Sequence, residues 1–141
     1  MTSVVGIVAA VVLLALGTLH VYWATGGSWG TDVAIPTREG RPRFVPNIAS
    51  TLTVAALLWA AALVLLGRVG VWGEWLPRWL FTGGTWTLVV VFGGRVVGDF
   101  RWFGLFKRMT RTRFAWWDTW LYVPLCALLA GAALLVAASG P

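Results

Sequence analysis

Four long apolar runs constrain what this chain can fold into more than any other feature of its sequence. They occupy residues 4–23, 48–66, 79–97 and 119–138. Each is close to the roughly 20 residues that a helix needs to cross about 30 Å of hydrocarbon. Because a bilayer core offers the backbone no hydrogen-bond partners, helices are the expected form. The runs predict an all-α membrane protein, an antiparallel bundle of four transmembrane helices in one domain over residues 1–141.

The overall composition agrees with a chain that lies mostly in lipid. It is 59% hydrophobic and only 11% charged, whereas a soluble domain carries about 25% charged residues. The net charge of +6 comes from bases in short loops beside the apolar runs. Bases so placed are typical of membrane topology and of contact with anionic headgroups, so we expect membrane lipids and not nucleic acid as partners.

The distribution of these bases predicts an orientation. Between the first and second runs lie three arginines, Arg38, Arg41 and Arg43, and around the connection of the third and fourth runs lie six Lys and Arg residues. The connection on the other side carries only Arg68 and Arg78. The positive-inside rule then places the first and third loops in the cytoplasm and both termini outside the plasma (inner) membrane. The first run lacks a positively charged leader, so we expect it to be a retained span.

The third loop also has an aromatic pattern. Phe100, Phe103, Phe106 and Met109 recur at every third position, with bases between them. This spacing predicts a short amphipathic helix on the cytoplasmic face, between the third and fourth spans. The alternative is a basic turn in which the aromatic residues are incidental.

Polar residues of all four spans fall at the same membrane depth in this topology. Arg95 and Asp99 are four residues apart, as are Asp118 and Tyr122, so each pair would share a helical face. The sequence therefore predicts a polar mouth at the cytoplasmic side of the bundle, to which the spans and their ends contribute His20, Asn47, Arg95, Asp99, Asp118 and Tyr122.

Two interpretations of this mouth stay open. In the structural one, Arg95 reaches lipid phosphates, Asp99 pairs with Arg95 or Arg101, and Asp118 pairs with Arg113. In the functional one, proton transfer would use the acid–base candidates His20, Asp99 and Asp118. Lipid binding would use Tyr22, Trp23, Asn47, Arg95, Arg101, Lys107 and Tyr122. We prefer the structural interpretation, because charges near the interface cost less than charges at the midplane and indicate function less strongly.

The sequence predicts no metal site and no cofactor. His20 is the only histidine and Cys126 the only cysteine. A histidine-rich metal site, bis-histidine haem ligation and an intramolecular disulfide are therefore excluded within one chain. We expect Cys126 to be a small buried or lipid-facing residue.

Three motifs resemble a known family. They are HxYWAxGGxWG at residues 20–30, GDFRxFGxFK at residues 98–107 and RFAxxDxxxYxPLC at residues 113–126. Together the motifs resemble the small bacterial integral membrane family called domain of unknown function 3995. The resemblance implies a four-span membrane protein without an assigned activity, and it supplies no catalytic residues.

Three functions remain open at this point. The first is a membrane protein that binds a lipid, a second copy of itself or another membrane protein at the polar mouth. The second is an enzyme that acts on a lipid or isoprenoid by acid–base chemistry with His20 and Asp99 or Asp118. The third is an oligomeric transporter. We rank transport last, because no ionisable residue lies near the middle of a span.

Overall fold

The computed structural model describes residues 1–35, 37–38, 41–42 and 46–139. Its long helices are α1 (Thr2–Ala24), α3 (Ile48–Arg68), α4 (Arg78–Val97) and a fourth helix over Arg113–Ala138. The fourth consists of α5 (Arg113–Trp117), a π-helical turn η1 (Asp118–Tyr122) and α6 (Val123–Ala138). The short elements are helix α2 (Thr31–Ala34) and an antiparallel pair of two-residue strands, β1 (Thr37–Arg38) and β2 (Arg41–Pro42).

All four long helices are long and apolar enough to cross a membrane. The prediction of an all-α, multi-pass membrane protein is confirmed. Three spans begin and end within about two residues of the predicted boundaries, including α4, which contains two Gly-Gly pairs and Arg95. The fourth helix is longer than predicted, because it begins at Arg113 and not at residue 119.

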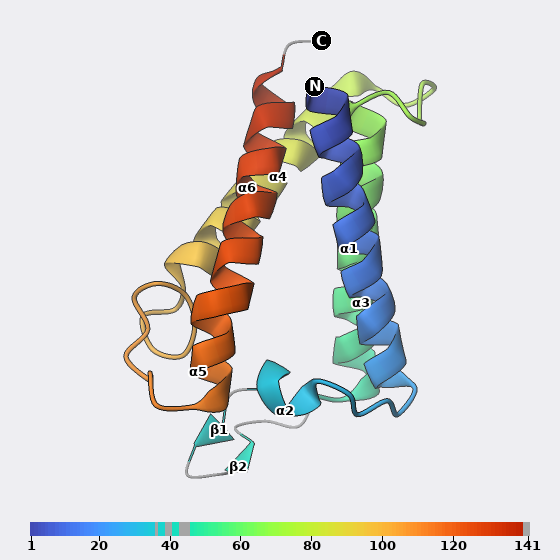
Figure 1. Ribbon diagram of the computed structural model, residues 1–141. Helices are drawn as coiled ribbons and strands as arrows, with labels where there is room; N and C mark the ends of the chain where they lie inside the picture. The colour runs from blue at the N-terminus through green and yellow to red at the C-terminus, as the bar shows by residue number, and fades with distance from the viewer. Residues whose placement is uncertain (36, 39–40, 43–45, 140–141) are drawn as a thin grey trace.

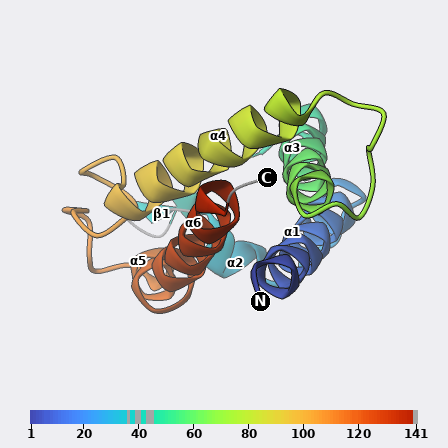
Figure 2. The ribbon, with the colours of Figure 1, turned by 90° about the horizontal axis from the view of Figure 1, so that it is seen from above.

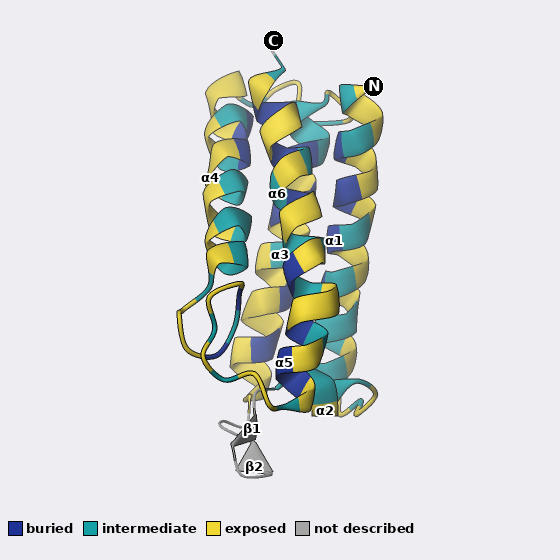
Figure 3. Cartoon of the chain, turned by 60° about the vertical axis from the view of Figure 1, so that its left-hand side comes forward, coloured by how far each residue is buried: buried dark blue, intermediate teal, exposed yellow. Residues whose placement is uncertain are grey.

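The helices form two antiparallel pairs. α1 packs mainly against α3, and α4 mainly against α6, while fewer contacts join one pair to the other (Figure 1 and Figure 2). Alanines on α1 and α3 let the two backbones approach closely. The buried side chains lie on the facing sides of the helices (Figure 3), and the largest buried cluster contains Ala9, Ala10, Leu13, Ala61, Ala62, Leu65, Leu129, Ala133 and Val136.

The π-helical turn η1 has a local cause in Pro124. Proline has no N–H to donate and its ring crowds the carbonyl four residues earlier, so the regular helical ladder cannot pass through it. The N–H of Val123 instead donates to the Asp118 carbonyl, which widens one turn of the helix. This wide turn places Asp118, which is fully buried, beside the end of α4.

The predicted amphipathic helix between the third and fourth spans is not formed. Residues 98–112 are a series of turns and bends, here called loop 98–112. Gly98 and Gly104 both have φ near +89°, which only glycine adopts at low cost. Their backbones lie in direct contact, and the N–H of Leu105 donates to the Val96 carbonyl. Glycine geometry thus overrides the three-residue aromatic period.

The two ends of the bundle carry different elements. One end holds both chain termini and the connection over residues 69–77, and the other holds α2, the strand pair and loop 98–112 (Figure 1). We call the second the polar end. Of the three first-loop arginines, Arg43 lies outside the described residues, and only the backbone is described for Arg38 and Arg41.

Candidate functional site

The polar end gathers the residues that the sequence singled out. His20 lies in the last turns of α1, Asn47 precedes α3, Arg95 lies in the last turn of α4 and Asp118 begins η1. Since the helices alternate in direction, these four positions meet at one end (Figure 1). The described helices therefore bring these predicted polar residues to one end of the bundle.

Asp118 is the centre of the site. Its Oδ1 accepts a hydrogen bond from Arg95 Nη2 at 2.6 Å. Its Oδ2 accepts from the Gly104 N–H at 2.8 Å and from Lys107 Nζ at 3.1 Å. The Asp118 side chain is 0% exposed, and that of Lys107 is 6% exposed. A buried carboxylate is stable only when paired and hydrogen-bonded, and here both oxygens have cationic partners.

Lys107 extends this network into the loop and the fourth helix. Besides Asp118, its Nζ donates to the Thr119 hydroxyl at 2.7 Å and to the Gly104 carbonyl at 3.2 Å. We call these residues the Asp118 cluster: Asp118, Arg95, Lys107, Gly104 and Thr119. The cluster joins α4, loop 98–112 and the fourth helix, so it fixes the loop against the bundle.

Arg95 has donors left over after it binds Asp118. Its guanidinium lies 4.4 Å from the centre of the Phe103 ring, a cation–π geometry. Its Nη1 is buried and has no hydrogen-bond partner among the residues described. One donor of the cluster is thus available to an acceptor that enters the polar end.

Asp99 has a different role from the predicted one. It lies beyond the end of α4, so it does not share a helical face with Arg95, and among the residues described no ion pair joins it to Arg95 or Arg101. Its Oδ1 accepts from the backbone N–H groups of Arg101, Trp102 and Phe103 at 2.6–3.1 Å. Partial burial raises the pKa of Asp99, but these three hydrogen bonds outweigh it, so the pKa lies below its usual value.

His20 makes its polar and ring contacts within its own helix and not with Asp99 or Asp118 in the part of the chain that the structure describes. Its Nδ1 is 2.8 Å from the Leu16 carbonyl, one helical turn earlier, and its ring meets Trp23 edge-on at 4.9 Å. Within the residues that the structure describes, no hydrogen bond or ion pair joins His20 to Asp99 or Asp118. These contacts make His20 a histidine hydrogen-bonded within its own helix, as in the structural interpretation.

The remaining predicted binding residues mostly hold the backbone. Asn47 is the N-cap of α3, and its Oδ1 accepts from the Ser50 N–H at 2.7 Å. The Trp23 indole N–H donates to the Trp29 carbonyl, and the Tyr122 hydroxyl donates to the Val33 carbonyl of α2. Tyr22 is 44% exposed.

Sequence reasoning paired Arg113 with Asp118, and the structure differs. Arg113 pairs with Asp32 at 2.8 Å, and both side chains are largely exposed. The cationic partners of Asp118 are Arg95 and Lys107 instead. The two glycines six residues apart, Gly98 and Gly104, were the sequence signal for the loop that brings Lys107 back to Asp118.

The exposed face of loop 98–112 combines aromatic and basic side chains. The rings of Phe100 and Phe106 stack with centroids 6.0 Å apart, and both are about 60% exposed. Leu105 is exposed beside them in the sequence, and the exposed bases are Arg101, Arg108 and Arg111. We call these six side chains the basic aromatic surface.

The site offers no arrangement that would hold a metal among the residues described, where no group of three or more His, Cys, Asp or Glu side chains gathers. Its chemistry is that of a buried acid held by two cations, beside an exposed surface that is both basic and apolar.

Comparison with curated proteins and with solved structures finds no significant match. The family described as "Protein of unknown function (DUF3995)" matches residues 13–134. That range covers all three sequence motifs, three of the four spans almost entirely, and the whole Asp118 cluster. The chain therefore belongs to the DUF3995 family.

Proposed function

We propose that this protein binds anionic lipid through the basic aromatic surface, and that the polar end faces the cytoplasm in a bacterial plasma membrane. The observation that carries the proposal is the stacked and exposed pair Phe100 and Phe106 among exposed arginines. Apolar rings enter the boundary of the acyl chains, while Arg side chains attract phosphates at the headgroup level.

The Asp118 cluster supports the proposal by giving the loop a fixed shape. A loop that is already ordered loses less conformational entropy when it binds. In the proposed role, Arg95 and Lys107 position the loop, while Arg101, Arg108, Arg111 and Tyr22 contact lipid. The unpartnered Arg95 Nη1 is a further donor for a headgroup oxygen.

The proposed orientation rests on where the Lys and Arg residues lie along the sequence. Nine Lys and Arg residues lie in the loops of the polar end or in the helix ends beside them, and two lie at the other end. Such a difference favours the cytoplasmic side for the polar end. The anionic lipids of that leaflet would then lie against the basic aromatic surface.

Lipid binding is preferred to acid–base catalysis for a chemical reason. Both oxygens of Asp118 already accept hydrogen bonds from Arg95, Lys107 or Gly104. A general base must reach its substrate, whereas the Asp118 side chain is 0% exposed, and a general acid must hold a proton near neutral pH. The lowered pKa of Asp99 also opposes a role as an acid.

Photocrosslinking tests the proposal. The protein is placed in nanodiscs with photoreactive phosphatidylglycerol or photoreactive phosphatidylcholine, and the crosslinked peptides are identified by mass spectrometry. We expect peptides from residues 98–112 to crosslink more to the anionic lipid. Since one base near an anionic surface contributes about 1 kcal/mol, Arg101→Gln should lower that preference about fivefold.

Asp32→Asn serves as the matched control, because it changes a charge at the same end but outside the basic aromatic surface. It should leave the lipid preference of the loop unchanged. Equal crosslinking of both lipids to residues 98–112 would contradict lipid binding. A loop that crosslinks to neither lipid would also contradict it and would favour a protein partner.

A further inference from the structure

We propose a second anion site at the opposite end of the bundle, in a pocket between the ends of α1, α3, α4 and α6. The ligand class is a phosphate-bearing molecule, either a lipid headgroup or a soluble phosphate. The site is independent of the lipid binding proposed above, because it shares no residue with loop 98–112 or the Asp118 cluster.

The pocket has room for such a ligand. Its volume is about 990 Å³ and it is partly open to the surroundings. Pockets that bind small molecules measure roughly 300–1,000 Å³. Its walls include the apolar side chains Val69, Leu76 and Phe81 and the hydroxyl groups of Thr2, Ser3 and Thr82. The lining thus combines apolar side chains with many charged and hydroxyl groups, so it suits a polar ligand more than an apolar one.

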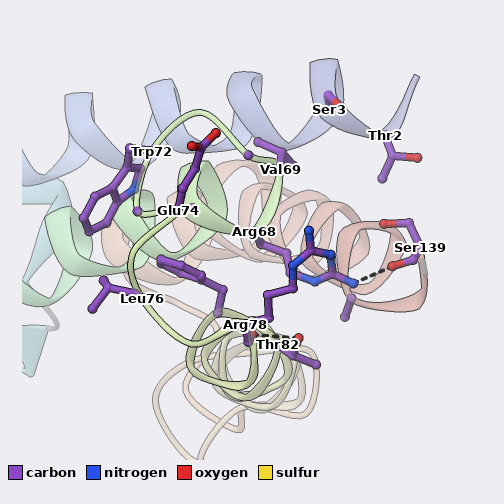
Figure 4. Close-up of a pocket in the computed structure, with 15 residues that line it drawn as sticks. Thr2, Ser3, Arg68, Val69, Trp72, Glu74, Leu76, Arg78, Thr82 and Ser139 are labelled. Atoms are coloured by element: carbon purple, nitrogen blue, oxygen red, sulfur yellow. Dashed lines mark hydrogen bonds between the residues drawn. The ribbon is translucent and has the colours of Figure 1, made fainter. Parts of the chain in front are cut away.

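Two arginines give the pocket its charge. Arg68 is the last residue of α3 and Arg78 the first of α4, and both side chains extend into the pocket (Figure 4). Arg68 Nη2 donates to the Ser139 carbonyl, but its Nε is buried and has no hydrogen-bond partner in the part of the chain that the structure describes. Glu74 also lines the pocket, yet no ion pair joins it to either arginine among the residues described. An unpaired donor on a guanidinium favours an acceptor such as a phosphate oxygen.

Two helix N-termini add to the attraction for an anion. α1 and α4 both begin at this pocket, are 23 and 20 residues long, and have no side-chain cap. Free N–H groups and the helix dipole at an N-terminus favour negative charge. The ends of α3 and α6 also lie here and oppose this effect, but Arg68 donates to the carbonyl of Ser139, the C-cap of α6.

Exposed tryptophans indicate the depth of the pocket in the membrane. Trp75 and Trp79 flank the pocket-lining residues Glu74, Leu76 and Arg78 and are more than 70% exposed. Tryptophans are enriched at the membrane–water interface. The pocket therefore lies at headgroup level, where both a lipid phosphate and a soluble phosphate can reach it.

Two measurements on the protein in phosphatidylcholine nanodiscs test this site. The first is phosphorus NMR line broadening of inorganic phosphate. The second is hydrogen–deuterium exchange of residues 69–77 before and after phosphatidylglycerol is added to the discs. We expect broadening, or added protection of residues 69–77, in the wild type. Because hydrogen bonds to charged groups contribute about 1.5–3 kcal/mol, Arg78→Gln should weaken either effect about tenfold or more.

Controls separate a loss of binding from a loss of folding. Arg78 is exposed, so Arg78→Gln should fold normally, whereas Arg68→Gln also loses its bond to Ser139. Arg78→Lys keeps the charge but not the planar fork, and should bind with intermediate strength. Arg113→Gln, at the polar end but outside the basic aromatic surface, should leave both signals unchanged.

The two measurements also distinguish the source of the phosphate. Broadening of inorganic phosphate that Arg78→Gln removes indicates a soluble ligand, and protection by phosphatidylglycerol alone indicates a lipid headgroup. Either result supports the site. The inference is overturned if the wild type responds to neither probe, or if the responses persist in both Arg78→Gln and Arg68→Gln. Hydrogen–deuterium exchange is read at residues 69–77 alone, and broadening that Arg78→Gln removes but Arg113→Gln keeps is assigned to this end. These results therefore do not depend on lipid binding at the polar end.

Discussion

Replacing Asp118 with asparagine should be among the most destabilising single changes at the polar end. The side chain keeps its shape but loses its charge. Arg95 and Lys107 then remain as cations without their acid, and Lys107 is only 6% exposed. Breaking a buried ion pair by removing one partner is costly, because it leaves an uncompensated charge out of water.

The size of the effect follows from the exposure of the three side chains. The loss from a broken buried pair is about 3–5 kcal/mol. Arg95 is 28% exposed and can reach water, and the asparagine oxygen can still accept from the Gly104 N–H. Both features reduce the loss, so we expect a decrease of about 3 kcal/mol in the free energy of unfolding for Asp118→Asn.

Unfolding in mixed micelles, followed by circular dichroism, measures this free energy. The matched control is Asp32→Asn, which removes the exposed pair with Arg113 at the same end. The side chains of Asp32 and Arg113 are 57% and 74% exposed. Ion pairs as exposed as this one contribute about 0–1 kcal/mol to stability. The reasoning is refuted if Asp118→Asn costs no more than Asp32→Asn. In a double-mutant cycle with Lys107→Gln, we expect a coupling of about 0.5–3 kcal/mol.

Three further results are expected. Gly98→Ala should destabilise the protein by about 1–3 kcal/mol in the same assay, because φ 89° and ψ −174° suit only glycine and a Cβ would overlap the Phe103 carbonyl. The control Gly94→Ala should be tolerated, because a Cβ at Gly94 would meet open space. Equal effects of the two substitutions would count against the loop geometry. The pKa of Asp99 is lower in the folded protein than the unfolded value of about 3.9. The ionised Asp99 therefore stabilises the loop above that pH, and this stabilisation is lost as the pH falls through the folded pKa. We expect proteolysis of loop 98–112 to increase at low pH in the wild type but not in Asp99→Asn. Alkaline phosphatase fused within residues 69–77 should be active outside the cytoplasm, and an inactive fusion there would reverse the proposed orientation.

Local signals in the sequence were enough to predict the spans. Length and hydropathy decide whether a segment can cross lipid, and both are properties of neighbouring residues. The four helices therefore formed where the apolar runs are, and α4 formed despite its glycines. The early start of the fourth helix at Arg113 was missed, because Thr112 caps it through the Ala115 N–H, in a polar stretch that hydropathy does not register.

The polar end was predicted as a location and not as a set of contacts. Alternating helix direction is enough to bring His20, Asn47, Arg95 and Asp118 to one side. Which acid meets which base depends on the path of loop 98–112. The aromatic period favoured a helix there, and Asp99 was expected to share a helical face with Arg95, but a turn closed by glycines formed instead.

The sequence by itself determined the class of this protein, its four spans and the side on which its polar residues gather, because these depend on the free energy of placing short segments in lipid. Only the tertiary structure decided that Asp118 is buried between Arg95 and Lys107, that His20 stays with its own helix, and that a pocket lies beside Arg68 and Arg78. These contacts join residues from different helices and loops. Their energies depend on distances of a few ångströms and on burial, and both are set only when the helices pack.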